Sequence, residues 1–135
     1  MDMGNLIFEL EDVYFSYLGK LPALCGISLK INQGEKVSII GANGSGKSTL
    51  LQMLDGLIFA DQGKVNFCGQ RLAEKTFGDA NFSLGFRQNV GFVFQNPDVQ
   101  LFCPTVKEEI VFGPLQLGLP KDLIWARLEK LAAVL

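Results

Sequence analysis

Gly41-Ala42-Asn43-Gly44-Ser45-Gly46-Lys47-Ser48-Thr49 is the most informative segment of the chain. It has the form G-x-x-x-x-G-K-[ST], which is typical of a phosphate-binding loop. Glycines at both ends allow backbone N–H groups to curl around a phosphate without interference from a Cβ atom. Lys47 adds a flexible positive charge, and Ser48 presents a hydroxyl group to a Mg²⁺ ion. The motif therefore predicts a site for a phosphate group and Mg²⁺.

The residues on either side give this motif the context that it requires. Lys36–Ile40 is a short β-rich run that leads into the loop, and Ser48–Leu54 is predicted to open an apolar helix. The first turn of such a helix carries unpaired N–H groups and the positive end of the helix dipole, which favour an anion. Strand, loop and helix follow in the required order; the alternative is a glycine-rich turn that binds nothing.

Length and composition restrict the classes of protein that fit. The chain has 135 residues, 48% of them apolar, and a net charge of −2, which predicts one domain with a core and gives no basic field for nucleic acid. Cys25, Cys68 and Cys103 lack C-x-x-C spacing and the chain has no histidine, so we expect reduced, mostly buried thiols and no structural zinc. No signal peptide is expected, and no apolar run approaches the roughly 18 residues that span a bilayer.

An antiparallel group of strands is predicted around the loop. Leu6–Tyr17 alternates as one long strand or a close pair, with a break in phase at Glu11-Asp12, and Ala23–Ile31 forms a second strand. Asn32–Glu35 is a tight turn into the loop strand, and Lys64–Phe67 is a further strand after the loop helix. Two strands therefore precede the phosphate loop.

The remaining residues are predicted to be helical with one strand. Arg71–Gly85 is expected to be an irregular surface loop with a short helical turn, followed by a strand at Val90–Gln95 that Asn96-Pro97-Asp98 stops. Thr105 and Glu108 have capping-box spacing and start a helix that Gly113-Pro114 interrupts. After Pro120, a last helix carries one apolar face, with Trp125 beside it as a core or partner contact: Ile124, Leu128, Leu131 and Leu135.

The order of these features resembles the ATP-binding cassette family, the ATPase subunits of ABC transporters. Phe15-Ser16-Tyr17 is similar to the family's adenine-stacking segment, which implies that Tyr17 packs on the base. Ordinary strand packing of Tyr17 is the alternative, and Tyr14 is the less favoured aromatic. Residues 41–49 match the family's Walker A, which implies ATP and Mg²⁺ as ligands of the following residues: Gly41, Asn43, Gly44, Ser45, Gly46, Lys47, Ser48 and Thr49.

Gln95, directly after Val90–Phe94, looks like the family's Q-loop glutamine. In the family this side chain touches Mg²⁺ and the attacking water, so the resemblance implies catalytic roles for Lys47 and Gln95 and metal binding by Ser48 and Gln95. A neutral amide suits this task because its oxygen can bind a metal while the group still hydrogen-bonds to water. A lone glutamine after a strand is weak evidence by itself; its place behind Walker A gives it meaning.

A narrower resemblance covers residues 93–114. Val93–Asp98, Gln100–Phe102 and Thr105–Pro114 are similar to the energy-coupling-factor and cobalt-type importers of metal ions and vitamins. This implies an ATP-binding subunit that couples ATP hydrolysis to import of a small solute. Its partners would be a transmembrane subunit that docks near the Q-loop and a second ATPase subunit, either identical or different. Its location would be the cytoplasmic face of the cell membrane, as a peripheral protein.

The implied fold is α/β, a P-loop NTPase core with an antiparallel β subdomain in residues 1–96 and the start of a helical subdomain in residues 97–135. The family pattern also demands a signature L-S-G-G-Q, a Walker B carboxylate with a following glutamate, and a switch histidine. The chain has no Gly-Gly pair and no histidine. Leu57–Asp61 has the apolar-then-Asp form of Walker B, but it directly follows the Walker A helix and Gln62 comes next, so we reject it.

These absences lead us to expect the N-terminal part of a longer, truncated ABC ATPase domain that by itself hydrolyses ATP negligibly. Without the glutamate that follows Walker B, no evident general base remains for the lytic water. The alternative is a non-hydrolysing nucleotide-binding fragment or regulatory module. A P-loop kinase or GTPase is less favoured because two strands precede the loop and no N-K-x-D base reader is present.

Overall fold

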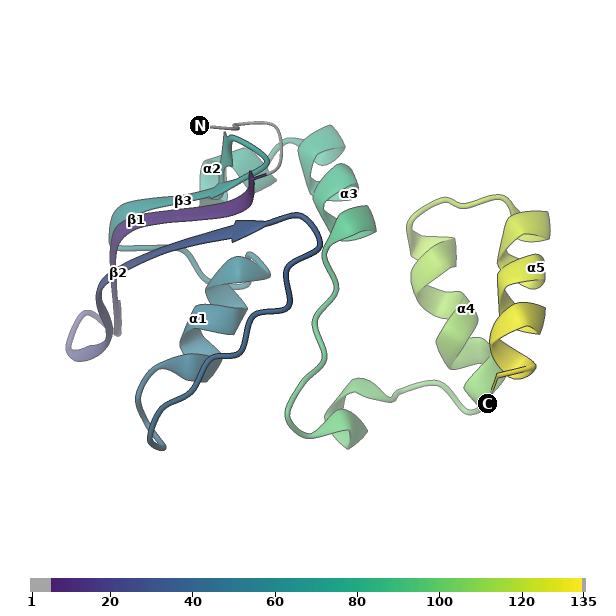
Figure 1. Cartoon of the computed structure of the whole chain (residues 1–135). Coiled ribbons are helices and arrows are strands. Elements are labelled where there is room, and N and C mark those ends of the chain that lie inside the picture. The colour runs from purple at the N-terminus through teal and green to yellow at the C-terminus, as the bar shows by residue number, and fades with distance from the viewer. Residues whose placement is uncertain (1–5, 135) are drawn as a thin grey trace. The chain divides into compact units, whose positions relative to one another are not determined.

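The computed structural model describes residues 6–134, which form two compact units (Figure 1). Among the described residues, the first unit ends at Ser83 and the second begins at Leu84. The predicted boundary after residue 96 concerns the subdomains of the family and stays a prediction. Residues 1–5 lie outside the described part. Leu135, the last residue of the predicted apolar stripe, also lies outside it.

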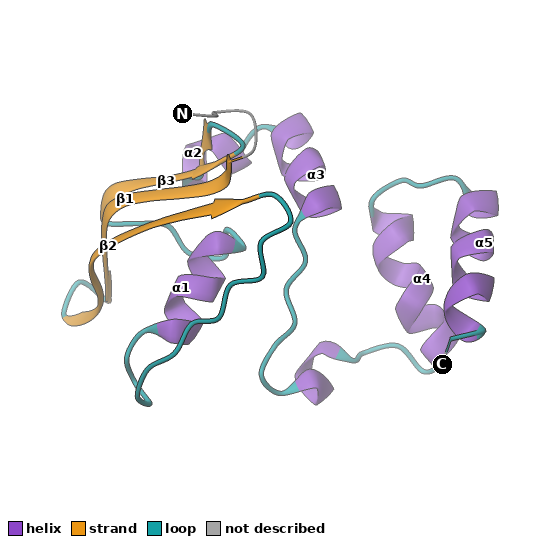
Figure 2. Cartoon of the chain, in the orientation of Figure 1, coloured by secondary structure: helices purple, strands orange, loops and turns teal. Residues whose placement is uncertain are grey.

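A four-stranded antiparallel sheet in the order β2-β1-β3-β4 forms the frame of the first unit (Figure 2). Its strands are β1 (Leu6–Tyr17), β2 (Leu21–Asn32), β3 (Gln62–Phe67) and β4 (Gln70–Arg71). The predicted antiparallel opening is confirmed, including the turn in which the Glu35 N–H donates to the Asn32 carbonyl at 3.2 Å. Strand β2 begins slightly earlier than predicted.

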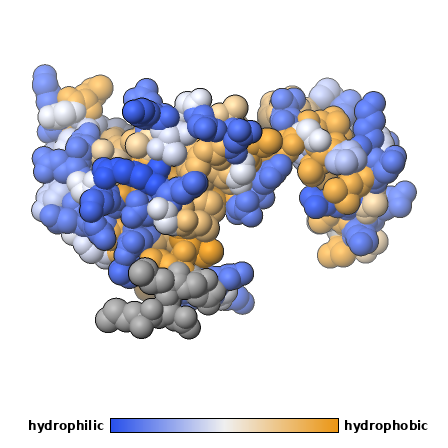
Figure 3. Space-filling model, turned by 90° about the horizontal axis from the view of Figure 1, so that it is seen from above, coloured by the Kyte–Doolittle hydropathy of each residue, from blue (hydrophilic) through white to orange (hydrophobic). Residues whose placement is uncertain are grey.

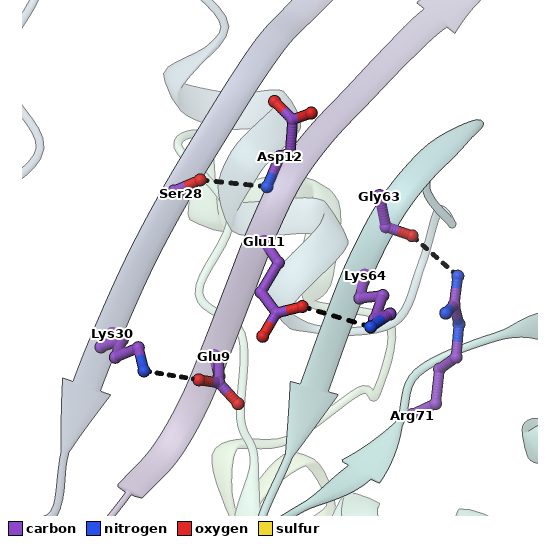
Figure 4. Close-up of polar contacts among 8 residues, drawn as sticks. All are labelled: Glu9, Glu11, Asp12, Ser28, Lys30, Gly63, Lys64 and Arg71. Atoms are coloured by element: carbon purple, nitrogen blue, oxygen red, sulfur yellow. Dashed lines mark hydrogen bonds and ion pairs between the residues drawn. The ribbon is translucent and has the colours of Figure 1, made fainter.

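A β-bulge at Asp12 explains the break in phase within β1. Leu10 and Val13 are both buried, although residues three apart in a regular strand point to opposite faces. The pairing with β2 shifts between Leu10 and Val13, and Asp12 takes a φ of 48°. The bulged Asp12 N–H donates to the Ser28 Oγ at 3.0 Å (Figure 4). The extra residue therefore returns the apolar side chains to one face.

Cross-strand ion pairs cover the polar face of this ladder. Lys30 Nζ lies 2.7 Å from the Glu9 carboxylate, and Lys64 Nζ lies 3.4 Å from that of Glu11 (Figure 4). The hydrogen bond from Lys30 holds the pKa of Glu9 below its usual value. Such exposed pairs contribute little to stability, so the buried face carries the fold.

Helix α1 (Lys47–Leu54) lies against the sheet beside β2 (Figure 1). Its residues Leu50, Met53 and Leu54 are buried at i, i+3 and i+4, the spacing of one helical face. The helix ends in a Schellman motif, because the Gly56 N–H donates to the Met53 carbonyl and the Leu57 N–H to that of Gln52. The predicted loop helix is confirmed.

Two short helices follow the sheet, where only a helical turn was predicted. Helix α2 (Glu74–Phe77) covers the end of α1, since a Cβ at Gly56 would lie 2.4 Å from the Phe77 ring. Helix α3 (Ala80–Asn89) is longer than the sequence suggested, and its Phe86 is buried. Asp79 accepts hydrogen bonds from the Asn81 and Phe82 N–H groups, which starts α3.

Two predicted strands are absent from the described residues. Lys36–Ile40 and Val90–Gln95 have no ladder partner there and form no strand, so both predictions are wrong for this structure. Ile40 is 94% exposed and Val93 is 82% exposed, whereas the paired strands bury Leu10, Val13 and Val65. A strand requires neighbouring backbone groups as hydrogen-bond partners, and an apolar β-rich run alone does not supply them.

After the end of α3, the second unit contains a 3₁₀ turn, η1 (Pro97–Gln100), and two helices, α4 (Val106–Gln116) and α5 (Lys121–Ala132), that lie side by side (Figure 1). Thr105 caps α4 as predicted, because its Oγ1 accepts from the Glu108 N–H and donates to the Glu108 carboxylate. The predicted interruption at Gly113-Pro114 is wrong: α4 continues to Gln116. Pro114 removes one hydrogen bond, but bonding resumes from the Leu117 N–H to the Gly113 carbonyl.

The surface of the second unit exposes apolar side chains among polar ones (Figure 3). Ile124 of α5 is buried and Leu131 is exposed, so the predicted stripe faces the core only in part. Trp125 is 43% exposed and Lys107 Nζ lies 4.6 Å from the centroid of its ring system. Within residues 6–134, no helix has the length and apolar character needed to cross a membrane. The thiols of Cys25 and Cys68 are exposed, so the expectation of mostly buried cysteines is wrong.

Candidate functional site

The phosphate loop joins the sheet to α1 through a close approach of Gly46 to β2. Gly46 has a φ of 88°, and a Cβ there would lie 2.4 Å from the Ala23 carbonyl oxygen. A side chain would therefore meet backbone as well as adopt an unfavourable left-handed conformation. At the other end, a Cβ on Gly41 would lie 2.7 Å from the Ser45 Oγ. The fold of the loop therefore requires glycine at position 46, whereas at position 41 a side chain would meet only the Ser45 side chain.

Lys47 lies along the inside of the loop. Its Nζ donates to the Gly41 carbonyl at 2.8 Å and to the Ala42 carbonyl at 2.7 Å, and the Ser45 N–H donates to the Ala42 carbonyl at 3.2 Å. The ammonium group thus lies beside the loop backbone that would also surround a bound phosphate. Since both partners are neutral carbonyl groups, the positive charge remains available to an anion.

The N-terminus of α1 points its unpaired N–H groups at the same place. Gly46 is the N-cap and offers no side-chain cap, and the first turn contains no acidic residue. The first N–H groups of a helix have no partner within the helix, so they favour an anion here. Ser48 is exposed at this end, whereas Thr49 is 6% exposed. The Ser48 hydroxyl group is therefore accessible to a metal ion bound with the phosphate.

The turn that leads into the loop is fixed by Glu35. Its carboxylate accepts from the Asn32 N–H at 2.8 Å and from the Asn32 side-chain amide at 3.0 Å. These hydrogen bonds hold the pKa of Glu35 below its usual value. The Glu35 carboxylate therefore stabilises the turn in its ionised form.

Tyr17 at the end of β1 is brought to helix α1. Its hydroxyl group lies 3.1 Å from the Thr49 Oγ1 and 3.4 Å from the Gln52 Oε1, and the residue is 40% exposed. Tyr14 is similarly exposed, but its hydroxyl group lies near Gly26, where an added Cβ would be 3.0 Å away. Of the two tyrosines, Tyr17 is therefore the one joined to the phosphate-loop helix.

Gln95 belongs to the second unit, whereas residues 41–49 belong to the first. It is exposed and follows Phe94, whose N–H donates to the Gln100 Oε1 at 3.1 Å. The Gln100 side-chain amide also donates to the Phe92 carbonyl at 2.9 Å. The Gln100 side chain thus pairs with the backbone just before Gln95. The metal-binding role of Gln95 stays a prediction.

Sequence reasoning missed Gln52 and Asp61. Asp61 was considered only as a Walker B residue; in the structure its carboxylate accepts from the Ser16 N–H at 2.7 Å. Gln52 falls one helical turn after Thr49, on the side of α1 that faces Tyr17. The i, i+3 spacing from Thr49 is the sequence signal that could have indicated Gln52; no pattern indicated Asp61.

The residues present fit a nucleotide phosphate chain with Mg²⁺. The Gly46 approach that a Cβ would fill, the inward Lys47 ammonium, the uncapped helix terminus and the accessible Ser48 hydroxyl all converge on one loop. When bound there, Mg²⁺ would neutralise phosphate charge beside Ser48. This loop and the helix α1 that follows it define the class of the protein as a P-loop nucleotide-binding protein.

Comparison with known proteins gives the family. The profile described as ABC transporter matches residues 24–133. The nickel import ATP-binding protein NikO of Rhodobacter capsulatus is 52% identical over 93% of this chain and 49% of its own length. The energy-coupling factor transporter ATP-binding protein EcfA of Methanothermobacter thermautotrophicus is 46% identical over 90% of this chain and 38% of its own length.

A solved structure agrees with this result. The protein cbiO1 of Clostridium perfringens, described as part of the ABC transporter complex cbiONQ, superposes with a TM-score of 0.76 and 32% identity. The match covers 93% of this chain and 49% of that one. The chain belongs to the ABC transporter family, and it spans about half the length, or less, of the relatives named here. The predicted family and its α/β fold class are confirmed.

Proposed function

We propose that the chain binds ATP with Mg²⁺ as the nucleotide-binding part of an ATP-binding subunit that drives import of a small solute. The observation that carries this proposal is the built phosphate loop, in which Lys47 Nζ and the uncapped N-terminus of α1 meet. The names of the relatives, which include nickel import and energy-coupling factor ATP-binding proteins, support an importer of metal ions or vitamins. Tyr17 supplies the base-stacking ring, and Gln95 the metal contact.

Thermal unfolding with Mg-ATP tests the nucleotide site. A ligand that binds only the folded state stabilises it by RT ln(1 + [L]/Kd), about 2.7 kcal/mol at a hundred times Kd. We expect a saturable rise in melting temperature for the chain that Lys47→Ala abolishes. Lys64→Ala removes the same charge from the same unit at an exposed pair and should leave the rise intact. No saturable rise in the unaltered chain would contradict the proposal.

ATP hydrolysis is proposed for the assembled transporter and not for this chain alone. The sequence has no Walker B carboxylate with a following glutamate, no Gly-Gly signature and no histidine. The residues that remain can hold phosphate and Mg²⁺, but they offer no evident general base for water. Phosphate release by the isolated chain should match that of Lys47→Ala; a robust rate that this substitution abolishes would contradict the proposal.

A cytoplasmic helix of a membrane subunit is the proposed partner of the segment after Gln95. Val99, Leu101 and Phe102 are 70%, 61% and 63% exposed and lie close together in the sequence of the second unit. The Phe102 ring packs edge-on against Phe112 at 4.6 Å, so the exposed ring is held in place. Docking through this segment would place the protein at the cytoplasmic face of the membrane. No nucleic acid is proposed as a partner.

The docking proposal is tested in the assembled transporter. Leu101→Asp with Phe102→Asp should abolish solute uptake while the affinity for Mg-ATP stays unchanged. Unchanged uptake would contradict it. A second ATPase subunit, identical or different, is proposed to complete the site, because residues 41–45 and Ser48 are exposed and need a further surface to cover bound phosphates.

A further inference from the structure

The Tyr17 hydroxyl group takes part in a hydrogen-bonded chain that ends on α1. The Gln52 Oε1 atom can only accept, so the Tyr17 O–H donates to it at 3.4 Å and accepts from the Thr49 hydroxyl group at 3.1 Å. Thr49 is 6% exposed, so its hydroxyl group is shielded from competing water. The outer end of the tyrosine ring is therefore attached to the helix, while 40% of the residue's surface remains exposed.

The backbone beneath the ring is held independently by Asp61. The Ser16 N–H donates to the Asp61 carboxylate at 2.7 Å, and the Asp61 N–H donates to the Tyr14 carbonyl at 2.9 Å. Phe15 contacts the Tyr17 ring edge-on, with centroids 5.0 Å apart and an interplanar angle of 86°. The ring is thus restrained at its backbone, at one edge and at its hydroxyl group.

Helix α1 connects this restraint to the phosphate loop. Thr49 and Gln52 lie one turn apart on the helix whose N-terminus carries Lys47 and Ser48. A ring attached to Gln52 therefore keeps a fixed position relative to bound phosphates. A flat ring held in this way can stack on a base with little loss of side-chain entropy, because its rotamer is already fixed.

We propose that Thr49, Gln52 and Asp61 are positioning residues that orient Tyr17 for a nucleotide base, so that base recognition depends on the tyrosine hydroxyl group as well as on the aromatic ring. This inference rests on the proposed ATP-binding function. It assigns Asp61 a role in base binding. It also predicts that the contacts of Tyr17 affect binding of the base and not binding of the phosphates.

A comparison of two ligands, one with a base and one without, distinguishes base binding from phosphate binding. The affinities for Mg-ATP and for inorganic tripolyphosphate with Mg²⁺ are measured by calorimetry for the unaltered chain, Tyr17→Phe and Gln52→Met. Tyr17→Phe removes both hydrogen bonds of the hydroxyl group and should weaken ATP binding about three- to tenfold, whereas Gln52→Met removes one and should weaken it about threefold. Tripolyphosphate binding should stay unchanged. Tyr14→Phe removes a hydroxyl group from the same strand and should change neither affinity.

The double variant Tyr17→Phe with Gln52→Met should bind ATP no more weakly than Tyr17→Phe, because Tyr17→Phe already removes the hydrogen bond to Gln52. If both ligands bind the unaltered chain and the variants bind ATP normally, the inference fails while the proposed function stands. Equal losses for ATP and tripolyphosphate would also overturn it, since the contacts would then support the phosphate site. If the unaltered chain binds neither ligand, the proposed function fails and the inference with it. Should Tyr17→Phe not fold, Gln52→Met carries the test.

Discussion

Strand β1 and residues 36–40 are both apolar and β-rich, yet the first forms a ladder and the second does not. Strand β1 lies between β2 and β3, and a short turn separates it from β2. Residues 36–40 have no ladder partner among the described residues. An apolar, β-rich run therefore forms a strand only where neighbouring backbone groups can pair with it.

Truncation of a side chain in each region gives the largest expected contrast. Leu10→Ala empties a site that is 1% exposed and should lower the free energy of unfolding by about 2–5 kcal/mol. Ile40→Ala, at a side chain 94% exposed, should change it by less than about 0.5 kcal/mol. Urea unfolding measures both. A loss in Ile40→Ala comparable to that in Leu10→Ala would show that residues 36–40 are packed in solution.

Glycine substitutions should sharpen the same contrast. Gly63 in β3 has a φ of 83°, and a Cβ there would lie 2.2 Å from the Asp12 carbonyl oxygen at the bulge. Gly63→Ala should therefore destabilise the protein by more than the roughly 1–2 kcal/mol that a left-handed backbone alone requires. Gly91→Ala, with no atom within 4 Å, should be neutral or stabilising by up to about 1 kcal/mol. Destabilisation by Gly91→Ala would show a ladder around residue 91.

The β1–β2 hairpin could be predicted from the sequence because its information is local. The break in phase at Glu11-Asp12 marks the position of the bulge, although it also allowed a close pair of strands, and the turn at Asn32–Glu35 marks the end of β2. The pairing of β1 with β3 joins segments far apart in the sequence and was not predicted. The strands at 36–40 and 90–95 could not be judged in this way, since their partners would have to be remote in sequence. Pro114 shows a different limit: a proline lowers helix stability, but the surrounding hydrogen bonds of α4 outweigh it.

The candidate site also has one part that the sequence predicts and one part that it does not. Residues 41–49 form a contiguous motif whose glycines and lysine have direct geometric reasons, so the sequence predicted the loop well. Tyr17 meets Gln52, and Asp61 meets the backbone beside Tyr17, only once the chain has folded, and no spacing encodes such contacts between distant segments. Tyr17 was found through a family resemblance, whereas Gln52 and Asp61 required the structure.

Hydrogen exchange at Phe94 tests whether a side chain can substitute for a strand partner. The Gln100 side chain accepts from the Phe94 N–H and donates to the Phe92 carbonyl, as a neighbouring strand would. We expect the Phe94 amide to exchange more slowly than that of Val93, by about tenfold for one hydrogen bond. Gln100→Leu should remove this difference, while the amides of β1 stay protected. Equal exchange at both residues before substitution would contradict the role of Gln100.

The smallest effect is expected at Glu109, which plays a related part before α4. Its carboxylate accepts from the Cys103 N–H at 2.8 Å and from the Phe102 N–H at 3.2 Å, and these bonds hold its pKa below the usual 4.5. A carboxylate with a lowered pKa in the folded state stabilises that state above the unfolded pKa, and this contribution is lost as the pH falls through the folded pKa. The fluorescence of Trp125, the chain's single tryptophan, reports on the same unit.

Thermal unfolding followed by that signal should show a lower melting temperature for Glu109→Gln at neutral pH. The difference from the unaltered chain should shrink below about pH 4.5, where the native carboxylate also becomes protonated. Glu108→Gln, which keeps an acceptor for the Thr105 hydroxyl group, is the matched control and should show a smaller pH-dependent difference. A Glu109→Gln difference that persists unchanged into acid would mean that the charge is not what holds residues 102–103. The segment before α4 would then be fixed by the aromatic contact between Phe102 and Phe112.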